Sequence, residues 1–230
     1  MQKQELKQGI KDSIPIILGY LPLGFAFGVL ANDVGMSIVQ ATMMSVLCFT
    51  GAGQYIALGI MQAGGAVFTI ILANVLVNLR YLLFSTSLVP YLKGRVPTAV
   101  GSLLSYGLTD ETYAVSMNRY QNHLPTASYI AGLNLSSHIG WITSTLLGAI
   151  LGNYIGDTDR LGLNFTLPAM YICLLVFMIK RKSDVFVALS SALLCLLIGY
   201  LVPATMENLF NIIIATIIAA SLGMLINERN

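Results

Sequence analysis

The sequence is poor in charged residues and in cysteine. Only 10% of its 230 residues are Asp, Glu, Lys or Arg, whereas a soluble domain carries about 25%. The formal net charge of +2 is too small to indicate a nucleic-acid partner. The three cysteines, Cys48, Cys173 and Cys195, lie in separate apolar runs without C-x-x-C spacing. We interpret them as buried apolar side chains, which excludes a disulfide framework and a metal site built on cysteine.

Enzyme signatures are also missing. The chain contains no H-E-x-x-H, no G-x-S-x-G and no glycine-rich phosphate loop. We therefore predict that the protein is not an enzyme and uses no cofactor. The sequence also offers no nucleotide site.

Apolar residues are abundant: 56% of the chain is hydrophobic and the mean hydropathy is +0.78. They fall in long runs, which is typical of a membrane protein, and a helix needs about 20 mostly apolar residues to cross the bilayer core. We predict an all-α polytopic membrane protein, a single transmembrane domain over 1–230, with some of its helices broken. The eight expected spans are 13–31, 41–61, 66–89, 98–117, 127–151, 163–180, 184–203 and 208–226.

The distribution of Lys and Arg predicts cytoplasmic termini, because cytoplasmic loops are enriched in these residues. If all eight spans cross, the inside segments hold eight of these residues and the outside segments hold three. Two of the outside residues, Lys93 and Arg95, fit this arrangement badly. The weakest span is 98–117, which Asp110 and Glu111 interrupt. If that span alone did not cross, the bias would reverse.

Similar segments suggest an internal duplication. "FTGAGQYIALGIM" (49–61) is similar to "FTLPAMYICLLVF" (165–177), and two further pairs recur in the same order at nearly the same spacing. The related halves would be 13–117 and 127–226. Transporters with duplicated halves bind their substrate near the middle of the membrane. Chance similarity between apolar strings is the alternative, and the sequence does not decide between a parallel and an inverted repeat.

A permanent cation, Arg80, stands inside the apolar run 66–89. A charge at the bilayer centre costs about 2.5–3.5 kcal/mol on insertion scales, and arginine cannot lose its proton. Snorkelling is the alternative, but apolar sequence continues on both sides. We predict that Arg80 faces a polar cavity and pairs with Asp110 or Glu111, only one of which can face it because neighbouring helical residues point about 100° apart. The alternative for these two carboxylates is a helix N-terminus at a loop.

Other polar residues and glycines interrupt the same apolar region. Asn74 and Asn78 share one helical face, where they can serve a binding site or hydrogen-bond a neighbouring helix. Gly51 and Gly53 precede Gln54. Glycines at this spacing allow either close helix packing or a broken helix, and the free backbone groups of a broken helix bind small zwitterions.

Two further features allow a functional interpretation. Pro22 together with Gly24 can produce a second break. His138 can carry a proton, although a histidine in a membrane helix more often hydrogen-bonds a neighbouring helix.

Three motifs occur together: "FTGAGQY" at 49–55, "NLRYLLFSTSLVP" at 78–90 and "LTDETYA" at 108–114. In order and spacing they resemble the AzlC family of branched-chain amino acid permeases. The resemblance covers most of the chain and is strongest in its first half. It implies a multi-pass permease of the bacterial inner membrane, the large subunit of a two-component exporter whose small membrane subunit belongs to the AzlD family.

The resemblance also identifies polar motif residues. They are Gly51, Gln54, Asn78, Arg80, Asp110 and Glu111. Two positions depart from the family pattern. Tyr81 stands where a histidine is common, which puts a proton-relay role at that position in doubt, and Gly53 stands where alanine is common.

Together these features predict a transporter subunit that exports small aliphatic amino acids such as leucine, isoleucine and valine. An apolar pocket would suit the side chain of such a substrate. Arg80 and the Asp110/Glu111 pair would supply opposite charges for its zwitterionic head. The alternatives are a passive channel and a scaffold for the small partner, with the partner forming the pathway.

Overall fold

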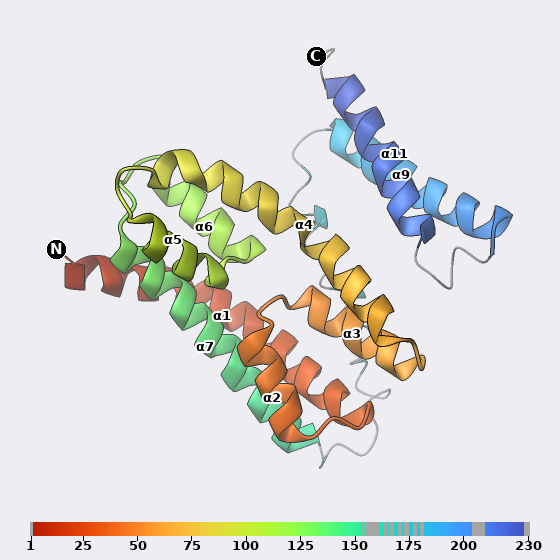
Figure 1. Cartoon of the computed structure of the whole chain (residues 1–230), viewed down its shortest axis with the longest axis horizontal. Coiled ribbons are helices and arrows are strands. Elements are labelled where there is room, and N and C mark those ends of the chain that lie inside the picture. Colours follow the sequence, from red (N-terminus) through yellow and green to blue (C-terminus); the bar gives the residue numbers. More distant parts are fainter. Residues whose placement is uncertain are drawn as a thin grey trace. The chain divides into compact units, whose positions relative to one another are not determined.

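The computed structural model describes residues 2–152, 182–203 and 210–227, with a few isolated residues between 154 and 179. Within these ranges every regular element is a helix (Figure 1), which agrees with the predicted all-α class. The chain divides into two compact units, residues 1–167 and 168–230. The number of crossing helices differs from the prediction, for reasons that lie in the first unit.

The second unit contains two helices among its described residues. These are α9 (Lys182–Leu201) and α11 (Phe210–Asn227), which pack against each other at the positions of the last two expected spans. The expected span 163–180 lies largely outside the described residues. The proposed duplication therefore stays a prediction.

Three long helices form the frame of the first unit: α1 (Gln2–Asp33), α4 (Val67–Leu92) and α7 (Ala127–Gly152). By length and composition, three described helices can cross a membrane, namely α1, α4 and residues 183–201 of α9. α7 is as long as α4, at 26 residues. The second break that Pro22 and Gly24 would allow is absent, because α1 continues through both of its prolines. Membrane helices tolerate proline where their neighbours satisfy the freed backbone groups.

Helices α1 and α7 lie side by side and run parallel (Figure 1). Gly9 near the start of α1 meets the backbone of Tyr129 near the start of α7, and Gly28 near its end meets the backbone of Ala149. At the same end the Asn32 amide donates to the Ala149 carbonyl oxygen at 2.6 Å. Small residues let the two backbones approach closely, as in other membrane helix pairs.

The expected span 41–61 is two short helices. α2 (Ile38–Leu47) and α3 (Ala52–Gln62) are separated by an irregular segment at 48–51. Each has about half the length needed to cross the bilayer core. We call this pair the first hairpin.

The first hairpin folds back on itself. Phe49, at its tip, packs against Tyr20 in the middle of α1, whereas Tyr55 packs against Phe27, closer to the end of α1. α3 therefore runs back toward the end at which α2 begins. The broken helix that the glycines allowed is present, but it does not span the membrane.

The expected span 98–117 is also a hairpin, and its predicted crossing is wrong. It consists of α5 (Thr98–Leu104), the short 3-10 helix η1 (Ser105–Gly107) and α6 (Asp110–Tyr120). We call it the second hairpin. The residues between η1 and α6 form its tip.

The direction of α6 follows from its ring contacts with α4. Phe84 stacks on Tyr113 with ring centroids 4.3 Å apart, and Tyr91 lies near Tyr120 at 6.1 Å. α6 therefore runs parallel to α4. Since α5 begins just after α4 ends, the second hairpin leaves that end and returns to it.

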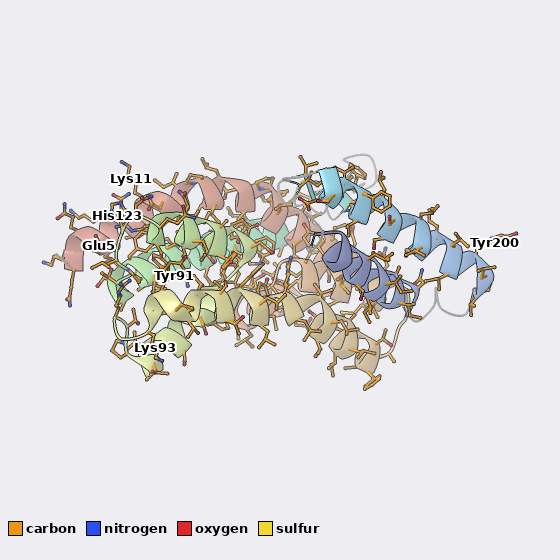
Figure 2. The ribbon with its side chains drawn as sticks, turned by 90° about the horizontal axis from the view of Figure 1, so that it is seen from above. Glu5, Lys11, Tyr91, Lys93, His123 and Tyr200 are labelled. Carbon is orange, nitrogen blue, oxygen red and sulfur yellow. The ribbon has the colours of Figure 1, made fainter. Side chains whose placement is uncertain are left out.

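The two hairpins thus enter the first unit from opposite ends, and their tips meet between α1, α4 and α7. The Tyr106 hydroxyl of the second hairpin donates to the Val46 carbonyl oxygen of the first. We call the end that holds the start of α1 the N-terminal end. It also holds loops 93–97 and 121–126, and Figure 2 shows Glu5, Lys11, Lys93 and His123 gathered there.

This arrangement explains the two cations that fitted the predicted topology badly. Within residues 2–152, every Lys and Arg except Arg80 lies at the N-terminal end. These residues are Lys3, Lys7, Lys11, Lys93, Arg95 and Arg119. Because two expected crossings are hairpins, all of these cations lie on one side of the first unit. Cytoplasmic segments are enriched in Lys and Arg, so this distribution favours a cytoplasmic N-terminal end.

Cysteine labelling tests this topology. In a variant without native cysteines, Thr98→Cys and His123→Cys should both resist an impermeant thiol reagent added to intact cells, because both positions lie at the N-terminal end. Ala63→Cys, at the opposite end, should react; all three positions are exposed. Reaction at position 98 but not at position 123 would restore the fourth crossing and contradict the hairpin.

Candidate functional site

A cluster of polar side chains lies where the two hairpin tips meet. We call it the central polar site. It comprises Tyr20 of α1, Thr50 of the first tip, Asn78 and Arg80 of α4, and Thr109, Asp110 and Glu111 of the second hairpin.

An ion pair joins α4 to the second hairpin in this site. Arg80 Nη1 donates to Asp110 Oδ1 at 3.0 Å and lies 2.9 Å from Oδ2. The two side chains keep 25% and 19% of their surface exposed, so the pair is reachable. Arg80 Nε is buried and has no hydrogen-bond partner among the described residues. The arginine in the middle of α4 is therefore neutralised by Asp110, and a second guanidinium nitrogen lies 3.5 Å from the Tyr81 hydroxyl.

Asp110 and Glu111 are the first two residues of α6. The alternative interpretation, that they mark a helix N-terminus, therefore also holds. Thr109 is the N-cap residue. Its side chain accepts a hydrogen bond from the backbone N–H of Thr112, and the side chain of Thr112 accepts one from the backbone N–H of Thr109. Carboxylates in a first helical turn are stabilised by the helix dipole. Asp110 faces Arg80, whereas the Tyr20 hydroxyl donates to Glu111 Oε2 at 2.8 Å.

The first hairpin tip is bound to α4 through its asparagines. Thr50 Oγ1 donates to Asn78 Oδ1 at 2.6 Å, and Asn74 Nδ2 donates to the Gly53 carbonyl oxygen at 3.2 Å. Gly51 has φ +52°, a conformation that favours glycine. Gly53 lies inside α3, where a Cβ would meet the Asn74 amide. Gly51 thus serves the break and Gly53 serves close packing.

Gln54 belongs to a separate buried network. Its Nε2 donates to Ser45 Oγ at 2.9 Å, and Trp141 Nε1 donates to its Oε1 at 2.9 Å. The Ser45 hydroxyl in turn hydrogen-bonds Thr145 Oγ1 at 2.8 Å. Gln54, Ser45 and Thr145 have no exposed surface. This network fastens the first hairpin to α7 and does not reach the Arg80 ion pair.

Replacing Gln54 by alanine should lower the free energy of unfolding by about 1–3 kcal/mol, because Trp141 Nε1 and Ser45 Oγ lose a buried partner. Gln62→Ala, at the exposed end of the same helix, is the matched control and should change little. Thermal unfolding in detergent, followed by the fluorescence of the single tryptophan, measures both. Equal melting temperatures for the two variants would contradict the proposed role.

Aromatic residues around the site gave no signal in the sequence. The Tyr20 ring lies edge-on to Phe49 and Trp141, with centroids 6.0 and 5.3 Å away. His138 stacks on Phe49 at 4.4 Å, and its Nε2 lies 3.0 Å from the Ser45 carbonyl oxygen. His138 thus makes the interhelical hydrogen bond that was one of its two interpretations.

A second ion pair, which the sequence also did not reveal, lies at the N-terminal end. Arg119 at the end of α6 contacts Glu5 of α1 at 2.9 Å, and its guanidinium carbon stands 4.1 Å from the centroid of the Tyr129 ring. The Tyr129 hydroxyl donates to Asp12 at 2.9 Å. These contacts fasten the returning leg of the second hairpin to α1 and α7.

The central polar site can bind a small ligand that carries both charges. It offers a guanidinium whose side chain is partly exposed, a second carboxylate in Glu111, and the backbone groups of two helix breaks. Among the described residues no group of three His, Cys, Asp or Glu could hold a metal ion.

Comparisons with known proteins agree on one family. The family model described as AzlC protein matches residues 15–155. The inner membrane protein YgaZ of Escherichia coli is 28% identical over 224 residues, which are 95% of this chain and 89% of the relative. An uncharacterized membrane protein of Archaeoglobus fulgidus is 33% identical over 178 residues, covering 76% and 77%. The branched-chain amino acid transport protein AzlC of Bacillus subtilis is 24% identical over 182 residues, covering 77% and 69%. No solved structure matches the chain.

Proposed function

The chain belongs to the AzlC family of transport-related membrane proteins, and on that premise we propose that it is a secondary transporter subunit exporting leucine, isoleucine and valine. The name of the Bacillus subtilis relative supports this substrate class. The resemblance of the three motifs supports a small AzlD-like membrane protein as its partner.

The observation that carries this proposal is the meeting of two broken helices at a partly exposed ion pair. Transporters use the free backbone groups and helix ends of broken helices to bind substrate near the middle of the membrane. Here the site offers Arg80 to a substrate carboxylate, and Asp110 and Glu111 to its ammonium group. A zwitterion that replaces the protein's own ion pair leaves no charge uncompensated.

The remaining residues of the proposed site support the hairpin tips. Gly51 forms the break between α2 and α3, and Asn78 accepts a hydrogen bond from Thr50 beside that break. Gly53 leaves space for the Asn74 side chain. We assign these residues, together with the buried Gln54, to positioning and not to direct contact with the substrate. Arg80, Asp110 and Glu111 are then the residues that touch substrate or carry the coupling charge.

Reconstitution in liposomes tests the function. Vesicles holding this chain with its small partner should show saturable leucine flux, and vesicles holding either subunit alone should show little. Non-saturable flux would indicate a passive channel, and full flux from the partner alone would indicate that this chain is a scaffold. The proposal is wrong if the complex, shown to be folded, moves none of the three amino acids.

A further inference from the structure

A cavity of about 300 Å³ lies in the first unit on the N-terminal side of the central polar site. Both legs of the second hairpin, α4 and α7 contribute to its walls. Most of its lining surface is apolar, with contributions from Leu88, Leu92, Leu104, Leu108 and Ile130, although four serines and Asn134 also contribute. The cavity can therefore accommodate an apolar side chain, and it also offers hydroxyl groups to a polar one.

The cavity extends from the N-terminal end toward the ion pair. Lys93, an exposed cation, stands at its outer rim, and Figure 2 places Lys93 at that end of the unit. Leu108 lines the inner part at the hairpin tip. It precedes by two residues Asp110, the partner of Arg80. A solute in the cavity is thus next to the segment that holds the central charges.

The α5 wall of the cavity is loosely packed. None of the seven residues of α5 is buried. Its last residue is tied to α7 by the Asn134 amide, which donates to the Leu104 carbonyl oxygen at 2.8 Å. A Cβ at Gly101, which lines the cavity, would find only Val96 Cγ1, at 3.9 Å. A Cβ can therefore be added at this position without a clash.

We propose that this cavity is an aliphatic subsite, which binds the side chain of a small apolar amino acid before its charged head reaches Arg80 and Asp110. This inference rests on the proposed function and adds a location for substrate selection. About 300 Å³ is at the small end of ligand pockets, and it leaves room for one branched aliphatic side chain. Each methylene that the cavity buries should improve affinity about fourfold.

Filling the cavity tests the proposal by transport. Gly101→Leu should lower leucine flux at least tenfold while alanine flux stays within twofold of wild type. Gly59→Leu is the matched control, because a Cβ there meets nothing within 4 Å and Gly59 does not line the cavity. It should leave the flux of every amino acid unchanged.

A labelling experiment separates this inference from the proposed function. In a variant without native cysteines, Gly101→Cys should react with a small thiol reagent, and saturating leucine, but not glutamate, should slow that reaction at least threefold. Protection by leucine supports the subsite even if reconstituted vesicles transport nothing. If wild-type vesicles transport leucine while Gly101→Leu behaves like Gly59→Leu and leucine gives no protection, the subsite is wrong and the proposed function stands.

Discussion

Arg80→Ala should abolish leucine transport and lower the amount of protein in the membrane. The substitution leaves the partly buried Asp110 carboxylate without its partner. Removing one member of a fully buried pair costs about 3–5 kcal/mol, and the remaining exposure of Asp110 lowers that cost. Arg80→Lys should rescue only in part. Its ammonium can replace the single nitrogen that contacts both Asp110 oxygens, but it cannot reproduce the planar group whose other nitrogen also reaches the Tyr81 hydroxyl at 3.5 Å. Leucine flux per unit of membrane-inserted protein separates the loss of transport from the loss of protein.

The matched control is Arg95→Ala. Arg95 is an exposed cation whose side chain makes, within the described residues, one hydrogen bond, a 3.5 Å contact to the Tyr91 carbonyl oxygen. Its removal should change neither protein level nor flux. If Arg80→Ala matches Arg95→Ala in both measurements, Arg80 only snorkels and the proposed site is wrong.

A second substitution identifies the partner independently of flux. Arg80→Ala combined with Asp110→Asn should recover the protein level, because no orphaned charge remains. Arg80→Ala combined with Glu111→Gln should not recover it, since Glu111 hydrogen-bonds Tyr20 and not Arg80. If the protein level recovers only when Arg80→Ala is combined with Glu111→Gln, the ion pair has been assigned to the wrong carboxylate.

The sequence predicted the need for this ion pair but not its geometry. The cost of an unpaired arginine in an apolar run required a carboxylate, and only two lay in the neighbouring segment. The choice between Asp110 and Glu111 depends on the rotation of α6, which the N-cap Thr109 fixes. Tyr20 was not identified, because a tyrosine within a long apolar helix carries no local mark of its polar partners.

Hydropathy could not separate a crossing helix from a hairpin of two half-length helices. Both contain about 20 mostly apolar residues, and 41–61 reads as one continuous run. The break depends on a positive φ at Gly51 and on hydrogen bonds to α4, which are contacts distant in sequence. The sequence contained one indication of the hairpins, because Lys93 and Arg95 lay on the outer side of the predicted topology. Both residues fall on the same side as the other cations of the first unit only when both spans are hairpins.

Gly28→Val should disrupt the packing of α1 on α7. Gly24 and Gly28 are spaced as in a G-x-x-x-G motif, and a Cβ at Gly28 would meet the Thr145 carbonyl oxygen and the Ala149 backbone nitrogen. Backbone atoms cannot rotate away, so the helices must separate. The loss should lie at or above the upper end of the roughly 1–3 kcal/mol typical of overpacking. Gly148→Val should act alike, because its Cβ would meet the Phe25 carbonyl oxygen.

Gly19→Val provides the control within the same helix. Gly19 is exposed, and a Cβ there meets nothing within 4 Å, so both variants add the same side chain to α1 and differ only in what it contacts. The amount of protein in the membrane and the unfolding midpoint, read from the buried Trp141 at this interface, should fall for Gly28→Val and stay unchanged for Gly19→Val. Equal values for the two variants would mean that α1 and α7 are not in close contact, and the parallel pair that positions both hairpins would have to be abandoned.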